Sequence, residues 1–270
     1  MARKQKKVRK TKPVVEKRPK KKLFGSRKTM NQRMNNHLHD ADIIGDKLPF
    51  SAAEAYKLLR TNLDFSITKD SKCKIFGFIS ALPGEGKTTT AVNTAYTIAQ
   101  TGQKVLLVEA DLRLPTVAKK LHVASRPGLS NCLVGSAKCT EVIQSTELNH
   151  NLFVLAAGDL PPNPAELLDS KQMKDILDIL SETFDTIIID MPPIGVVTDG
   201  LILSRMVDGM ILVVRENYCE KGALDDTVRK LNFAGAKVLG FVMSAAGAGD
   251  GGKYGKYGKY GKSGGYYGHK

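Results

Sequence analysis

The sequence lacks tryptophan, and it is poor in cysteine and in long apolar runs. Its four cysteines, at positions 73, 132, 139 and 219, form no Cys-x-x-Cys pair and have no histidine at zinc-ligand spacing, which predicts scattered thiols in a reducing cytosol. No apolar run follows the basic N-terminus, so a signal peptide is not expected. No stretch approaches the roughly 20 apolar residues that a membrane-spanning helix needs. We expect a soluble protein that meets a membrane only peripherally or through a partner.

Acidic residues are scarce at both ends, which makes the net charge of +14 uneven. Residues 1–28 hold 14 Lys or Arg and a single acid, Glu16, while residues 253–270 hold five Lys and no acid. The intervening residues 29–252 hold 22 basic and 26 acidic side chains and are mildly acidic. Basic tails of this kind favour anionic surfaces, either lipid headgroups or nucleic acid.

Composition divides the chain into three parts. Residues 1–46 are rich in Lys, Arg, Asn and Gln without apolar periodicity, which predicts a disordered basic arm. Residues 47–246 carry the apolar patterns of a folded domain, and residues 247–270 reduce to a Gly/Lys/Tyr-rich tail that cannot bury a core. For the basic arm, docking on the inner leaflet and a solvated solubility tail remain equal alternatives.

A short helix is expected at the start of the domain. Ser51 followed by Glu54 fits a capping box, and Leu58, Leu59 and Leu63 make an apolar stripe.

Strand and helix patterns alternate from residue 75 onward. Apolar runs predict strands at 75–80, 105–109, 152–156, 186–190, 209–214 and 238–244. Helices fit at 88–100, 164–180, 198–204 and 220–233, the second opening with Asn163 as cap, Pro164 at the first position and Glu166 at the third. This order predicts an α/β fold with a mostly parallel sheet covered by helices on both faces.

The strongest motif is a P-loop between the first strand and the helix at 88–100. Gly84 and Gly86 let backbone N–H groups converge on phosphate oxygens at the positive end of the helix. Lys87 would reach the β- and γ-phosphates, and the Thr88 hydroxyl would ligate Mg²⁺. The alternative, a plain Gly-rich turn, does not explain the flanking strand and helix. The predicted nucleotide-binding residues are Pro83, Gly84, Glu85, Gly86, Lys87, Thr88 and Thr89, in a P-loop NTPase fold.

Three acidic residues follow buried strands. Glu109 and Asp111 lie at alternate positions after 105–109, and Asp190 ends an Ile-Ile-Ile-Asp strand of the Walker B type. We expect Thr88, Asp111 and Asp190 to organise Mg²⁺, since this ion prefers oxygen ligands. Glu109 or Asp111 would accept a proton from an attacking hydroxyl. Taken alone, the first two are also compatible with surface acids, and Asp190 with a capping residue.

The C-terminal tail carries a cluster of tyrosines: Tyr254, Tyr257, Tyr260, Tyr266 and Tyr267. One interpretation is an array of phosphate acceptors, because phosphates would turn this basic segment negative. The other is a tail that stacks on RNA bases, because basic residues alternate with aromatic ones.

In these motifs the chain resembles the bacterial tyrosine kinases of capsule and exopolysaccharide synthesis, over about residues 45–270. The resemblance rests on residues 83–88, 109–113, 162–168, Asp190 with the two prolines at 192 and 193, and the tail tyrosines. It implies a tyrosine autokinase using Mg·ATP, with catalytic residues Lys87, Glu109, Asp111 and Asp190. It also implies a ring in which one subunit's tail enters its neighbour, and a role in polysaccharide production.

The partners implied by the resemblance are a tyrosine phosphatase and a separately encoded transmembrane activator. The activator would hold the chain in the cytoplasm at the inner face of the membrane. Nucleic acid is not expected as a partner. The family has Asp where this chain has Glu109, and one extra methylene moves a carboxylate by roughly an ångström. The family's oligomerisation motif, Glu-x-x-Arg-x-x-Arg, corresponds here to Glu54, Lys57 and Arg60, and lysine lacks the two-pronged hydrogen bonding of arginine.

Two other functions are compatible with the same nucleotide-binding motifs. A partition-type or cell-division-type ATPase would use the same fold as a positioning switch, but such proteins carry a second Lys early in the P-loop, and residues 81–85 contain none. A scaffold that binds ATP only to assemble is the third possibility.

Overall fold

The computed structural model describes residues 44–67 and 72–245, so most of the basic arm and all five tail tyrosines lie outside the described residues. Ile44 is buried, and Gly45–Lys47 forms a 3-10 helix, η2, whose first N–H donates to Asn93 Oδ1 at 3.0 Å. Ordered contacts therefore begin within the segment 1–46 that was predicted to be a disordered arm. Within the described ranges, no helix has both the length and the hydropathy required to cross a bilayer.

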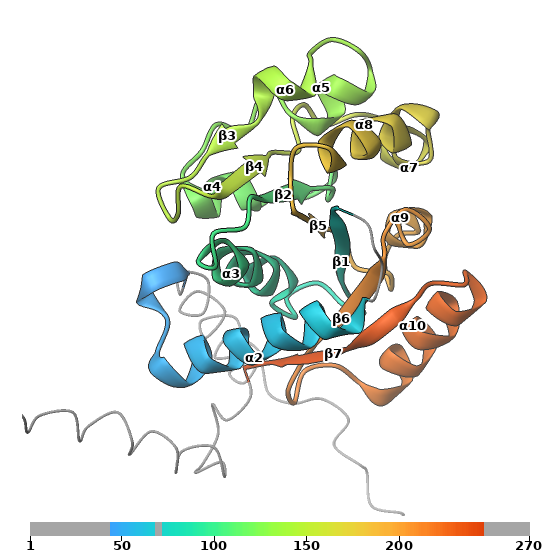
Figure 1. The fold of residues 1–270 in the computed structure, drawn as a ribbon. Helices are drawn as coiled ribbons and strands as arrows, with labels where there is room; N and C mark the ends of the chain where they lie inside the picture. The colour runs from blue at the N-terminus through green and yellow to red at the C-terminus, as the bar shows by residue number, and fades with distance from the viewer. Residues whose placement is uncertain (1–43, 68–71, 246–270) are drawn as a thin grey trace, which may run out of the picture. The chain divides into compact units, whose positions relative to one another are not determined.

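A sheet of seven strands forms the centre of the described domain, in the order β3-β4-β2-β5-β1-β6-β7 (Figure 1). Every pairing is parallel except that of β3 with β4. The strands are β1 Lys74–Ser80, β2 Val105–Glu109, β3 Gln144–Ser145, β4 Leu152–Leu155, β5 Thr186–Asp190, β6 Gly209–Arg215 and β7 Val238–Ser244. The predicted α/β P-loop fold with a mostly parallel sheet is confirmed. Only the two-residue β3 was missed, because it is too short to show an apolar pattern.

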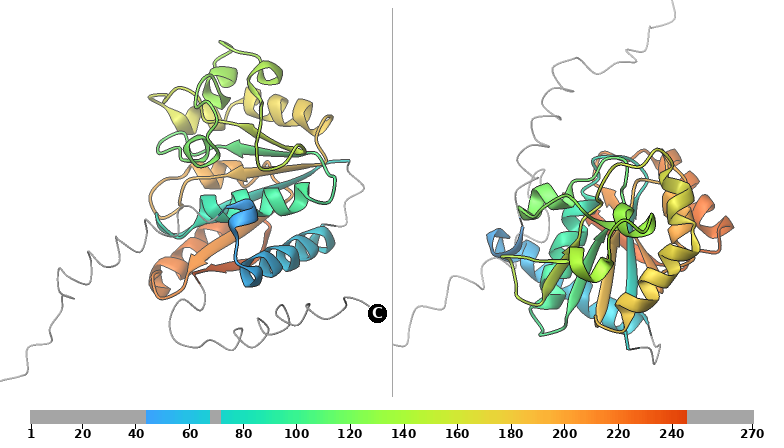
Figure 2. Two further views of the ribbon diagram at one scale, coloured as in Figure 1. Left: turned by 90° about the vertical axis from the view of Figure 1, so that its left-hand side faces the viewer. Right: turned by 90° about the horizontal axis from the view of Figure 1, so that it is seen from above.

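Helices cover both faces of this sheet (Figures 1 and 2). They are α2 Phe50–Ser66, α3 Lys87–Ala99, α4 Val117–Leu121, α5 Leu129–Leu133, α6 Cys139–Val142, α7 Pro164–Leu168, α8 Lys171–Ser181, α9 Asp199–Leu203 and α10 Lys221–Phe233. One apolar core joins α2 and α3 to the sheet, and the other joins α8, α9 and α10 to the opposite face. Burial of the strands on both faces explains why they read as continuous apolar runs.

The single helix predicted at 164–180 is wrong, because the chain forms two. Helix α7 opens with Pro164 at its first turn, as predicted, but ends at Leu168. The Ser170 side chain then caps α8 by accepting a hydrogen bond from Met173 N at 3.3 Å. A serine that satisfies an unpaired N–H favours a new helix start over a continuous helix.

The predicted capping box at Ser51 is also wrong. Helix α2 begins at Phe50 after Pro49, and no side chain caps it. It runs for 17 residues and is not short. Only Leu63 of the predicted stripe is buried, while Leu58 is 63% exposed.

Candidate active site

The P-loop connects the end of β1 to the start of α3. Gly84 and Gly86 have φ angles of 81° and 84°, a left-handed conformation that side chains disfavour. A Cβ atom on Gly86 would lie 3.2 Å from the Ser244 hydroxyl. The two glycines are therefore required by the path of the loop.

Three side chains outside the motif hold the loop by its carbonyl groups. Ser244 Oγ donates to the Glu85 carbonyl at 2.6 Å, Tyr218 Oη donates to the Pro83 carbonyl at 3.0 Å, and Arg215 donates to the Gly84 carbonyl at 3.4 Å. The Arg215 guanidinium also lies over the Tyr218 ring, 5.8 Å from its centre.

These hydrogen bonds to the carbonyl groups also fix the direction of the loop's amide groups. In a trans peptide the C=O and the following N–H point in opposite directions. Holding the carbonyls of residues 83–85 on one side therefore turns the N–H groups of residues 84–86 to the other side. An amide array of this kind at a helix N-terminus is suited to bind phosphate oxygens.

Lys87, Thr88 and Asp190 meet beside the loop, although they are far apart in sequence. Lys87 Nζ lies 2.6 Å from Asp190 Oδ1, and Thr88 Oγ1 donates to Asp190 Oδ2 at 2.7 Å. Both charged residues are buried, with exposed fractions of 8% for Lys87 and 1% for Asp190. Burial raises the pKa of Asp190, and the ion pair with Lys87 opposes that rise. They meet because β5, which ends at Asp190, pairs directly with β1.

Glu109 is directed into the protein rather than into solvent. It is fully buried, and it pairs in register with Asp190 across β2 and β5. Its Oε1 accepts the N–H groups of Thr116 and Val117, and its Oε2 accepts that of Ala157 at 3.3 Å. Burial raises its pKa, and these backbone hydrogen bonds act against the rise. The carboxylate thus joins the loop before α4 to the end of β4.

Asp111 is the more accessible of the two carboxylates. Its Oδ1 accepts the N–H groups of Arg113 at 3.3 Å and Leu114 at 3.0 Å, while Oδ2 makes no hydrogen bond within the described residues. Its negative charge contributes to the raised pKa of Asp190, so the two carboxylates lie near each other. The structure therefore brings together the acidic residues that the sequence selected.

Arg113 and Asp199 form an ion pair that the sequence did not indicate, in which only Asp199 is buried. Arg113 Nε lies 2.8 Å from Asp199 Oδ2, and Nη2 lies 3.0 Å from Oδ1. Asp199 is fully buried at the start of α9, so the pair attaches to that helix the loop after β2 that carries Asp111 and Arg113, here called the acidic loop.

Comparisons with known proteins agree with this geometry. A family model described as an AAA domain matches residues 73–236. The chain is 40% identical over 192 residues to the tyrosine-protein kinase YwqD of Bacillus subtilis, covering 71% of this chain and 80% of that protein. It is 36% identical over 206 residues to the tyrosine-protein kinase CpsD of Streptococcus pneumoniae, covering 75% and 89%. The chain belongs to the bacterial tyrosine-protein kinases.

Solved structures support this assignment over the rival one. The kinase domain of the Escherichia coli tyrosine kinase ETK aligns with a TM-score of 0.68 at 32% identity, over 71% of this kinase and 74% of that chain. The septum site-determining protein MinD of Pyrococcus horikoshii, complexed with Mg-ADP, aligns with a TM-score of 0.56 at 27% identity, over 66% and 72%. The cell-division ATPases are therefore the more distant relatives.

In this kinase the predicted oligomerisation residues on α2 point in different directions. Glu54 and Lys57 form an exposed ion pair at 2.7 Å. Arg60 instead donates to the Thr97 carbonyl of α3 at 3.0 Å, and so braces α2 within the same subunit.

Cys219, next to Tyr218, provides a pH-dependent probe of the loop. Burial and the nearby Glu85 raise the pKa of its thiol to about 11. Because only the thiolate is nucleophilic, we expect alkylation by iodoacetamide at pH 8 to be about a hundredfold slower than for a thiol of ordinary pKa. The rate should increase about tenfold per pH unit until the pH nears 11. Peptide mapping would measure it, with denatured protein as control; a rate equal to the control's would contradict the placement beside Glu85.

Proposed function

We propose that this kinase transfers the γ-phosphoryl group of ATP to the tyrosines of its own tail: Tyr254, Tyr257, Tyr260, Tyr266 and Tyr267. The observation that carries the proposal is the cluster of Lys87, Thr88 and Asp190 beside a P-loop whose carbonyls are held from outside. That combination places a buried cation, a hydroxyl and a carboxylate next to backbone amides suited to a triphosphate.

The donor set fits Mg²⁺. The Thr88 hydroxyl and the Asp190 carboxylate are hydrogen-bonded neighbours, and the charge of Asp111 is close enough to affect Asp190. Oxygen ligands that include one or two carboxylates are those Mg²⁺ takes in phosphoryl-transfer sites. When bound, the ion would offset the negative charge of the phosphate oxygens.

Residues of the chain itself would bind the phosphates and activate the tyrosine hydroxyl. Lys87 would leave its pair with Asp190 to neutralise charge on the β- and γ-phosphates, and the N–H groups of residues 84–86 would hold the phosphate oxygens. The bond from the γ-phosphorus to the β–γ bridging oxygen breaks, and a bond to the tyrosine Oη forms. Asp111 orients the hydroxyl and takes its proton, because its Oδ2 is available whereas both oxygens of Glu109 are engaged.

Glu109 then acts as a positioning residue, and the two acids should respond differently to amide substitution. We expect Asp111→Asn to lower the phosphorylation rate more than 100-fold. Glu109→Gln should keep the rate within about tenfold but lower the free energy of unfolding by about 1–3 kcal/mol, because one backbone N–H loses its acceptor. Initial rates and urea unfolding of both variants measure this. If Glu109→Gln loses as much activity as Asp111→Asn, the proton acceptor has been assigned to the wrong residue.

The assembly and partners belong to the same proposal. We propose a ring built through the exposed Glu54–Lys57 face of α2, activation by a separate membrane protein and reversal by a tyrosine phosphatase. The basic residues 1–28 would add contact with anionic lipid at the inner leaflet, since each Lys or Arg near such a surface contributes about 1 kcal/mol. The output would be control of capsular or exopolysaccharide production, as the resemblance implies.

Intact mass spectrometry after incubation with ATP and Mg²⁺ tests the proposed reaction. We expect mass added in steps of one phosphate, absent when all five tail tyrosines are replaced by phenylalanine. That variant leaves residues 44–245 unchanged, so its ATP binding should match that of the parent chain. ATP turnover without phosphotyrosine would favour a positioning ATPase, and binding without turnover a scaffold; either result would overturn the autokinase.

A further inference from the structure

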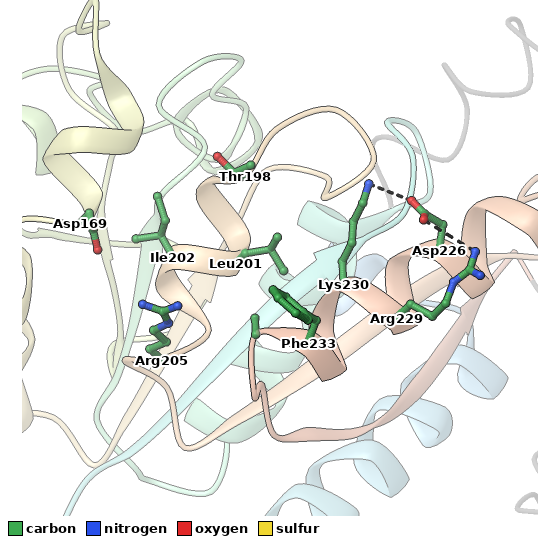
Figure 3. A pocket seen from close by; sticks show the side chains of 10 residues that line it. Asp169, Thr198, Leu201, Ile202, Arg205, Asp226, Arg229, Lys230 and Phe233 are labelled. Carbon is green, nitrogen blue, oxygen red and sulfur yellow. Dashed lines mark ion pairs between the residues drawn. The ribbon is translucent and has the colours of Figure 1, made fainter.

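A groove between α9 and α10 shares no residue with the P-loop site. It encloses about 660 Å³ and is lined from both helices and from the residue just after α7 (Figure 3). Both helices pack on the same face of the sheet, in the apolar core that also contains α8. The groove is therefore a surface feature of the folded domain rather than a part of the nucleotide site.

Apolar side chains from both helices line part of this groove, and one of them is an exposed aromatic ring. Phe233, the last residue of α10, is 96% exposed, and Leu201 and Ile202 of α9 line the same groove (Figure 3). A phenylalanine so completely exposed contributes nothing to the core. An aromatic ligand would bury it, because ring pairs add about 0.5–1.5 kcal/mol beyond the area they cover.

The rim of the groove is basic. Arg205, just after α9, is exposed and makes no ion pair with another described residue. On the α10 side, Asp226 lies 2.8 Å from Lys230 and 3.8 Å from Arg229, so this one carboxylate serves two cations. The only other acid in the lining is Asp169, and the cations are in excess.

We propose that this groove binds a phosphotyrosine of the kinase's own tail. The inference rests on the proposed function, because autophosphorylation would create the ligand. The phenyl ring would lie on Leu201 and Phe233, and the phosphate would pair with the guanidinium of Arg205. Phosphate adds about −1.5 to −2 charges, and Arg matches its oxygens with two parallel hydrogen bonds.

Chain length permits the tail to reach the groove of the same subunit. Ala234 lines the groove, and the seven residues of β7 then lead to Ser244, a rise of roughly 23 Å at about 3.3 Å per residue. Tyr257 follows Ser244 by thirteen residues, which span at most about 43–47 Å when extended. That reach is about twice the length of β7.

Charge explains why binding would depend on phosphorylation. The lining holds three cations and two acids, so its net charge of +1 repels the unmodified tail, which carries five Lys and no acid in residues 253–270. A phosphate on Tyr257 reverses the local charge. The phosphorylated tail would then be held on α9 and α10, away from the P-loop that modified it.

A binding measurement tests this without relying on the kinase reaction. The probe is a labelled synthetic peptide of residues 253–262 carrying phosphotyrosine at 257, titrated by fluorescence anisotropy into the full chain with its five tail tyrosines replaced by phenylalanine. We expect it to bind at least tenfold more tightly than the unmodified peptide. Arg205→Ala should weaken binding about tenfold and Phe233→Ala several-fold. Both residues are exposed, so neither change should affect folding. Lys138→Ala, an exposed cation on α6's N-terminal side, should have no effect.

Three results would overturn the proposal: equal affinity for the unmodified peptide, full affinity in Arg205→Ala, or equal affinity for a peptide with glutamate at 257. The last would indicate a site for acidic peptides in general. Because the phosphate is introduced by synthesis, a chain that fails to phosphorylate itself could still bind the peptide. A chain that phosphorylates itself but ignores the peptide would refute only the groove.

Discussion

Replacing Lys87 with methionine should lower the rate of tail phosphorylation by at least about 10²–10³-fold. Methionine has nearly the same length but no charge, so the phosphates lose the cation now held 2.6 Å from Asp190. Losing one preorganised electrostatic group at a site of developing charge typically costs this much. Initial rates of phosphotyrosine formation at saturating ATP would measure the effect.

The same substitution also leaves Asp190 buried without its counter-ion, so a folding defect has to be separated from a catalytic one. We expect Lys87→Met to lower the unfolding midpoint, because an uncompensated buried carboxylate is costly. The double variant Lys87→Met/Asp190→Asn removes both charges and should recover most of the stability while staying inactive. Because Asp190 is itself a proposed Mg²⁺ ligand, the double variant reports on stability alone. A folded Lys87→Met variant that keeps the parent phosphorylation rate would mean that Lys87 serves folding rather than phosphoryl transfer.

The strands could be predicted from the sequence because strands buried on both faces have continuous apolar sequences. All five residues of β2 and all five of β5 are buried, and the predicted bounds of both strands agree with the structure. No comparable sequence pattern marks the break between α7 and α8. The apolar spacing continues across Asp169 and Ser170, and only the hydrogen bond from Met173 N to the Ser170 side chain shows that a new helix starts.

The site combines residues that a local motif reveals with residues that only the folded sheet brings beside them. The P-loop and Asp190 are local patterns, each at the end of one strand. Tyr218 and Ser244 reach the P-loop because β6 and β7 come next after β1 in the strand order of the sheet. The P-loop motif does not predict this order. The rule that ligands bind at the carboxyl ends of parallel strands would have directed attention to both.

The position of Glu109 could be predicted from the sequence, but its contacts could not. Its place after a buried strand is readable from the pattern. Its hydrogen bonds to the loop before α4 and to Ala157 are not readable, because they depend on how those segments fold back. The pattern alone therefore left Glu109 and Asp111 equivalent as proton acceptors.

Arg113→Ala should lower the free energy of unfolding by about 2–3 kcal/mol, a large effect for a residue whose side chain is 40% exposed. The loss arises at its partner, since Asp199 is fully buried and both of its oxygens accept from this one guanidinium. Removing one member of a buried pair costs about 3–5 kcal/mol, and the exposure of Arg113 reduces that figure. Urea unfolding at neutral pH would measure the loss.

A double-mutant cycle with Asp199→Asn separates this ion pair from simple loss of side-chain packing. If the pair carries the effect, Arg113→Ala/Asp199→Asn should be more stable than Arg113→Ala alone, because no buried charge is left unpaired. We also expect Arg113→Ala to lower the phosphorylation rate, and the double variant should not restore it, because both variants lack the side chain that holds the acidic loop. The Arg113 N–H donates to Asp111 Oδ1, and the Arg113 side chain joins that acidic loop to Asp199 at the start of α9. Additive losses would instead mean that Arg113 and Asp199 contribute independently, and the acidic loop would then owe its position to Glu109 and its backbone contacts.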